Sequence, residues 1–67
     1  MSVAKITEIS STSKKSFDDA IKDGIKRAHE TLKGIKGAWV NDMKVDVKDG
    51  EISEYRVNLR VTFVLKD

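Results

Sequence analysis

The side chains best suited to binding a small molecule lie in the C-terminal half of the chain. Trp39 offers a large flat ring for stacking on an aromatic ligand, and Arg56 offers a planar fork for a carboxylate, a phosphate or a carbonyl group. A structural role is open as well, because Trp39 would also pack at a subunit contact against Arg60, and Arg56 would pair with a glutamate of a neighbouring subunit. Together with Asn58, these residues form a candidate ligand-binding set.

Five carboxylates downstream of Trp39 could supply hard oxygen ligands to a cation. Calcium requires about six to eight oxygens gathered at one point, and the sequence has no Asp-x-Asp-x-Asp-Gly loop. A cation site would therefore have to be built across subunits, and the alternative is a solvated face of mixed charge. The carboxylates are Asp42, Asp46, Asp49, Glu51 and Glu54.

Catalysis is not expected from this set of residues. His29 is the only imidazole, and no serine, aspartate or cysteine is spaced to complete a nucleophilic unit with it. The chain also lacks a glycine-rich loop that could cradle a phosphate. The sequence therefore predicts a binding protein and not an enzyme.

The composition indicates a small domain whose core needs support from other copies. The 67 residues include no cysteine and no proline, so disulfides cannot stabilise the core, and no cluster of residues could hold zinc. The 13 Lys and Arg residues against 11 Asp and Glu leave a net charge of +2, which does not favour nucleic acid as a partner. No apolar run approaches the roughly 20 residues of a membrane span, and the N-terminus lacks a signal-peptide pattern. We expect one cytoplasmic domain, residues 1–67, that forms a homo-oligomer.

One strand and one helix are expected in the N-terminal half. Imperfect alternation predicts a strand over residues 3–9, ended by the polar residues 10–13. Ser13 is the predicted N-cap of the helix, and Gly34 its predicted stop. The helix has an apolar stripe whose central side chains are small, which predicts close packing on a sheet. The stripe consists of Phe17, Ala20, Ile21, Gly24, Ile25, Ala28 and Leu32.

Two long strands are expected in the C-terminal half. Residues 38–48 alternate in polarity, Asp49-Gly50 is typical of a two-residue type I′ turn, and the segment from Tyr55 to Leu65 alternates clearly. A strand-helix-strand crossover makes the first two strands parallel, so the simplest sheet has the order first, third, second, with antiparallel neighbours.

The turn predicts the register and therefore the two faces of the sheet. It pairs Lys48 with Glu51, Met43 with Arg56, Asn41 with Asn58 and Trp39 with Arg60. Val57, Leu59, Val61 and Phe63, with Ala38 and Val40, then face the helix. The other face carries Trp39, Met43, Val45, Val47 and Ile52 among Arg56, Asn58 and Arg60, and needs another copy to cover it. A one-residue bulge would instead move Met43, Val45 and Val47 to the helix side.

Short motifs along the whole chain make it similar to the dodecins. The resemblance implies an α+β fold of β-α-β-β order, in which a three-stranded antiparallel sheet wraps around one helix, and a hollow assembly of twelve copies. The best-known members store or buffer flavins. The motifs are Lys5-Ile6, Thr12-Ser13, Ser16-Phe17, Ala20-Ile21, Arg27-Ala28, Thr31-Leu32, Glu54-Tyr55-Arg56-Val57 and Val61-Thr62-Phe63.

The flavin site is where this chain departs from the flavin-binding members that it resembles. An ungapped alignment places Gly37 where those members have a stacking tryptophan, and Arg56 where they have a glutamine. Tyr55-Arg56-Val57 resembles a subgroup that lacks the stacking tryptophan and includes calcium dodecins. The resemblance implies a non-enzymatic storage protein for riboflavin or FMN, bound at Gly37, Trp39, Arg56, Asn58 and Arg60. The alternative is a flavin-free assembly that holds divalent cations at its interfaces or has a structural role.

Overall fold

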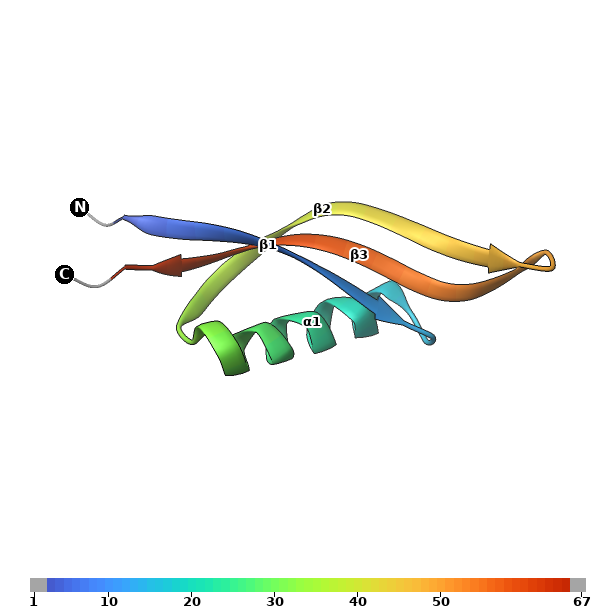
Figure 1. The fold of residues 1–67 in the computed structure, drawn as a ribbon, viewed down its shortest axis with the longest axis horizontal. Coiled ribbons are helices and arrows are strands. Elements are labelled where there is room, and N and C mark those ends of the chain that lie inside the picture. Colours follow the sequence, from blue (N-terminus) through green and yellow to red (C-terminus); the bar gives the residue numbers. More distant parts are fainter. Residues whose placement is uncertain (1–2, 66–67) are drawn as a thin grey trace.

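The computed structural model describes residues 3–65, which form one helix and a three-stranded sheet (Figure 1). The elements are β1 (Ala4–Ser13), α1 (Phe17–Leu32), β2 (Ile35–Lys48) and β3 (Glu51–Val64). The sheet order is β1-β3-β2, and both neighbouring pairs are antiparallel. The predicted element order and sheet topology are therefore confirmed.

The first strand is longer than predicted. The serine-rich residues 10–13 continue β1, because Ser11 pairs with Val57 and Ser13 pairs with Tyr55 on the central strand β3. Pairing with a long partner strand thus outweighs the turn preference of serine. The predicted end of this strand was wrong.

The N-cap of the helix lies three residues farther along the chain than predicted. Ser16, not Ser13, is the N-cap, and its hydroxyl accepts a hydrogen bond from the backbone N–H of Asp19 at 3.0 Å. The hydroxyl of Ser13 donates to the Asp19 carboxylate at 2.7 Å and accepts from the backbone N–H of Lys15 at 2.9 Å. Ser13 therefore orders the connection between β1 and α1.

The end of the helix lies close to the predicted glycine. Lys33 is the C-cap, with its backbone N–H donating to the carbonyl of His29 at 3.0 Å, and Gly34 follows with a φ of +66°. β2 then begins at Ile35, three residues before the predicted start.

A small core lies between α1 and the sheet. Ala20, Val57, Leu59 and Val61 are fully buried, and Ile9, Phe17, Ile21, Ile25, Leu32 and Ile35 pack around them. Gly24 permits the close approach of α1 to β1, since a Cβ there would lie 2.8 Å from the Cβ of Ser11. Phe17 meets Tyr55 edge to face, with ring centroids 5.2 Å apart. The predicted helix face and its close packing are confirmed.

The β2–β3 hairpin has the predicted turn but an irregular register. Asp49 and Gly50 have φ values of +53° and +78°, and Lys48 pairs with Glu51. Ser53 and Asn41 are each an extra residue where the register shifts. A further shift lies between Ile35 and Gly37.

Two of the four predicted pairs in the hairpin were wrong. Met43 pairs with Val57 and not with Arg56, and Asp42 takes the predicted place of Asn41 opposite Asn58. The bulges cause both differences, and the pair of Trp39 with Arg60 is confirmed. Met43 and Val45 therefore lie on the same side of the sheet as α1, although α1 covers another part of that side. This is the arrangement that a bulge was expected to produce.

The hairpin projects beyond the end of the helix (Figure 1). We call its outer part, residues 43–55, the hairpin arm. Met43, Val47 and Ile52 in the arm are at least half exposed, because α1 does not reach them. The apolar surface that α1 leaves exposed is thus largely on the arm, and not on the sheet face opposite the helix as predicted.

Candidate functional site

The sheet face away from α1 collects polar side chains from all three strands, and we call it the polar face. The register brings all five predicted ligand-binding residues to this one face. It carries Ile6, Glu8, Ser10 and Thr12 from β1, Gly37, Trp39, Asp42, Lys44 and Asp46 from β2, and Glu54, Arg56, Asn58, Arg60 and Thr62 from β3.

An exposed aromatic ring lies at one end of the polar face. Trp39 is 60% exposed and lies directly opposite Arg60. With Ile6 and Asn41, these two residues line a hollow of about 390 Å³. The arrangement offers a flat apolar surface beside a guanidinium group, which suits a planar ring with polar substituents.

Gly37 borders the same end of the face. Its carbonyl accepts a hydrogen bond from the hydroxyl of Thr62 at 3.2 Å, and the two residues line a smaller hollow of about 230 Å³ with Trp39. A Cβ at Gly37 would meet only Thr62 Oγ1, at 3.5 Å, so this end of the face is open.

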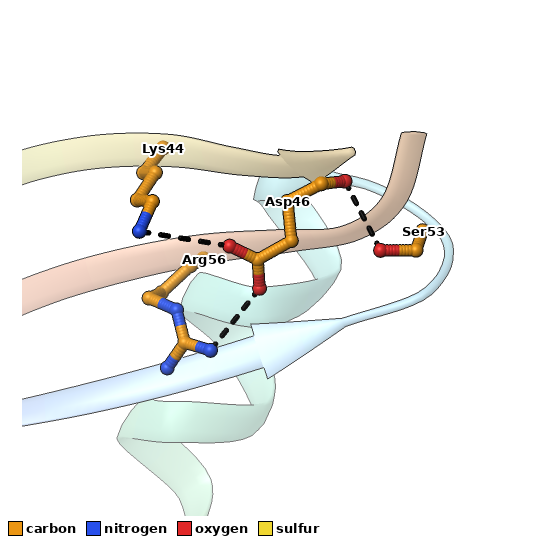
Figure 2. A network of polar contacts seen from close by, with 4 residues as sticks. All are labelled: Lys44, Asp46, Ser53 and Arg56. Atoms are coloured by element: carbon orange, nitrogen blue, oxygen red, sulfur yellow. Dashed lines mark hydrogen bonds and ion pairs between the residues drawn. The ribbon is translucent and has the colours of Figure 1, made fainter. Parts of the chain in front are cut away.

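Arg56 lies toward the hairpin arm and binds a carboxylate of its own chain (Figure 2). Its Nη2 atom donates to Oδ2 of Asp46 at 3.1 Å, and Nζ of Lys44 lies 3.8 Å from Oδ1 of the same residue. The hydroxyl of Ser53 donates to the backbone carbonyl of Asp46 at 3.1 Å. The sequence left open a ligand group or a glutamate of a neighbouring subunit as the partner of Arg56; within this chain its partner is Asp46.

Asn58 connects the two ends of the polar face. Its Nδ2 atom donates to Oε2 of Glu8 at 2.6 Å, and Glu8 pairs directly with Arg60 across the strands. A third hollow of about 280 Å³ lies on the other side of Asn58. It is lined by Ser10, Asp42, Met43, Lys44, Arg56 and Asn58.

The regular register predicted from the turn did not place Asp42, Lys44 and Asp46 on this face, and only the alternative with a bulge did. The predicted regular register put them with the helix, whereas the bulge at Asn41 places them beside Asn58 and Arg56. The sequence signal for this bulge was the alternation of these three charged residues with Met43 and Val45. Only a one-residue shift in register places the charged residues on the same face as the polar residues of β3.

Away from the polar face, Arg27, Glu30 and Thr31 of α1 line a hollow with Ser10 and Ser11 of β1. Among residues 3–65, no three His, Cys, Asp or Glu side chains come together in a way that could hold a metal ion. His29 is exposed on α1. In the same part of the chain, no helix has the length and apolar character needed to cross a membrane.

Comparison with known proteins identifies the family. The family model described as Dodecin matches residues 3–66. The chain belongs to the dodecin family. No curated protein sequence is significantly similar to it.

Solved dodecin structures agree with this assignment. The dodecin from Streptomyces davaonensis is 32% identical, with a TM-score of 0.92 over 98% of this chain and 97% of that one. A mutant of the Thermus thermophilus dodecin is 28% identical, with a TM-score of 0.91 and complete coverage of both chains. The predicted dodecin fold is therefore confirmed.

One similar dodecin is described by what it chelates. It is a calcium chelating immunodominant antigen from Mycobacterium tuberculosis, a calcium dodecin with a novel calcium-binding site. Its sequence is 31% identical, and the structures share a TM-score of 0.82 over 96% of this chain and 91% of that one.

Proposed function

We propose that this dodecin binds and stores a small planar ligand on the polar face, without catalysing a reaction. Flavin, as riboflavin or FMN, is the proposed ligand. Trp39 stacks on the ring, Gly37 leaves space beside it, and Arg60, Asn58 and Arg56 bind polar groups of the ligand. The observation that carries the proposal is the 60% exposure of Trp39 beside Arg60, in a hollow on the polar face.

A homo-oligomer of twelve copies is part of the proposal. The chain exposes 5238 Å², against about 4,200 Å² for a compact monomer of 7.5 kDa. Its radius of gyration is 13.7 Å, whereas about 11 Å is typical for 67 residues. The excess surface includes the apolar residues of the hairpin arm, and further copies of the chain would cover it.

A second candidate function is cation binding at subunit interfaces. The similarity to a calcium dodecin and the carboxylates of Glu8, Asp42, Asp46 and Glu54 on one face favour it. Because no three such groups converge within residues 3–65 of one chain, the ligands of this site would come from more than one copy.

Flavin titration tests the first candidate directly. Riboflavin or FMN is added to protein of measured oligomeric mass, and the loss of flavin fluorescence on stacking is followed. We expect saturable quenching at a fixed number of flavins per assembly. Trp39→Ala should weaken binding about tenfold or more, because it removes a stacking surface, while Trp39→Phe should retain part of the affinity.

The matched control is Val3→Ala, which removes exposed apolar atoms outside both the candidate site and the hairpin arm. It should leave the flavin affinity unchanged. Quenching that is the same in Trp39→Ala as in the unaltered protein would remove Trp39 from the site. An intact assembly that quenches no flavin would contradict the proposal and favour the cation-binding alternative.

A further inference from the structure

Asp46 holds two cationic side chains at one point of the polar face (Figure 2). Arg56 Nη2 lies 3.1 Å from Oδ2, and Lys44 Nζ lies 3.8 Å from Oδ1. The side chains of Lys44 and Arg56 are 70% and 44% exposed, whereas that of Asp46 is only 28% exposed. Both cations are therefore accessible from solvent and already aimed at a pair of anionic oxygens.

The adjoining hollow supplies neutral donors to the same region. Ser10 and Asn58 line it together with Lys44 and Arg56, in a volume of about 280 Å³, and Met43 and the carboxylate of Asp42 complete the lining. A guanidinium, an ammonium, a hydroxyl and an amide are the groups that proteins use to bind a phosphate or a carboxylate. The surroundings of Asp46 thus fit an anionic group of a ligand.

This cationic region and the Trp39 ring belong to one surface. Lys44 pairs with Arg56, and Trp39 pairs with Arg60, four residues along β3. Four residues of strand span about 13 Å. A ligand whose ring carries its anionic group on a flexible chain can reach both places, because no strand crosses the face between them.

We infer that this face selects planar ligands that carry a phosphate or carboxylate, and that Asp46 is an internal competitor which the ligand's anion displaces from Lys44 and Arg56. The inference rests on the proposed function for ring binding and adds the chemical class of the ligand. Asp46 acts here as a specificity-determining residue, since its carboxylate occupies both cations until an external anion replaces it.

Riboflavin and FMN separate the anion from the ring, because they share the ring and the ribityl chain and differ in the phosphate. The measured quantity is the ratio of their dissociation constants, riboflavin over FMN. In Asp46→Asn, both cations lose their internal partner, and we expect this ratio to rise about fivefold. A larger effect is not expected, because Glu54 lies opposite Asp46 and keeps one carboxylate nearby.

The matched control is Asp49→Asn, which removes the same charge from the turn of the same hairpin, where asparagine tolerates the positive φ. Asp49 is exposed, does not line the hollow and has no cationic partner among the ion pairs of residues 3–65. Its ratio should stay within twofold of that of the unaltered protein. Adding Arg56→Gln to Asp46→Asn should abolish the gain.

Two results would overturn the inference: an unchanged ratio in Asp46→Asn, or an equal rise in Asp46→Asn and Asp49→Asn. If neither flavin binds any variant, the proposed function fails, and inorganic pyrophosphate tests the anion site separately. Pyrophosphate should then raise the thermal midpoint of Asp46→Asn more than that of Asp49→Asn. Equal midpoint shifts would reject the anion site as well.

Discussion

At the scale of single residues, Gly24 shows how closely the helix approaches the sheet. A Cβ on Gly24 would lie 2.8 Å from the Cβ of Ser11 and 3.5 Å from Cδ1 of Leu59. Alanine favours a helix over glycine by about 1 kcal/mol, whereas overpacking a tight contact costs about 1 to 3 kcal/mol. We expect Gly24→Ala to lower the free energy of unfolding by about 1 kcal/mol, measured by denaturant titration.

A double-mutant cycle separates the contact from other effects. In a Ser11→Gly background the opposing Cβ is gone, so Gly24→Ala should cost less there or become favourable. Gly37→Ala is the control, because its new Cβ would meet Thr62 Oγ1 at an ordinary 3.5 Å. Equal costs of Gly24→Ala in both backgrounds would contradict this account of the packing.

The residues of the candidate site were only partly predictable. Alternation along two strands joined by a two-residue turn is enough to place Trp39, Arg56, Asn58 and Arg60 on one face. Asp46, the partner of Arg56, could not be placed in this way. Its position depends on two bulges, and the residues at those bulges, Asn41 and Ser53, carry no distinctive turn signal.

At the scale of the elements, the bulge at Asn41 can be tested by deletion. Val40 pairs with Leu59 and Asp42 pairs with Asn58, so removing Asn41 leaves a regular ladder with every pair unchanged. We expect the deletion variant to fold, with Trp39 still opposite Arg60 and Lys44 still opposite Arg56. Cross-strand contacts measured by NMR would check both pairs.

Deletion of Met43 is the matched comparison. Here a regular ladder places Asp42 opposite Val57, on the face that carries the core. This variant should be less stable than the Asn41 deletion by about 1 kcal/mol or more, measured by thermal unfolding. A reversed order of stability would show that Asn41 does not set the faces of β2.

The elements were more predictable than their ends. The apolar residues of the helix and those of β3 are buried against each other, and their spacing of three or four residues and of two residues is visible in the sequence. The end of β1 was missed because residues 10–13, although serine-rich and typical of turns, remain paired with the long partner strand β3. The helix cap was misplaced for the same reason, since Ser13 still belongs to the strand.

At the scale of the whole molecule, the hairpin arm carries the apolar surface that the proposed assembly would cover. Ile52 is 50% exposed there and pairs with Val47, which is 62% exposed. We expect Ile52→Asp to shift the protein toward smaller species, because it places a charge in the surface that neighbouring copies would cover in the proposed assembly. Analytical ultracentrifugation at several protein concentrations would measure this shift.

Ser53→Asp is the control for the added charge, since Ser53 is an exposed polar residue of the same arm. It should preserve the assembly. If Ile52→Asp sediments like the unaltered protein, the arm does not take part in the contact between copies.

The sheet order also has a consequence for the biosynthesis of the protein. β3 is the central strand, and it follows β1 and β2 in the chain. During translation, β1 and β2 are therefore made before the strand to which both are hydrogen-bonded. α1 likewise cannot bury its apolar face before Val57, Leu59 and Val61 have been made, because these residues form most of the core that it covers. The sheet thus closes only after β3 has left the ribosome, and folding is coupled to the final stage of synthesis of these elements.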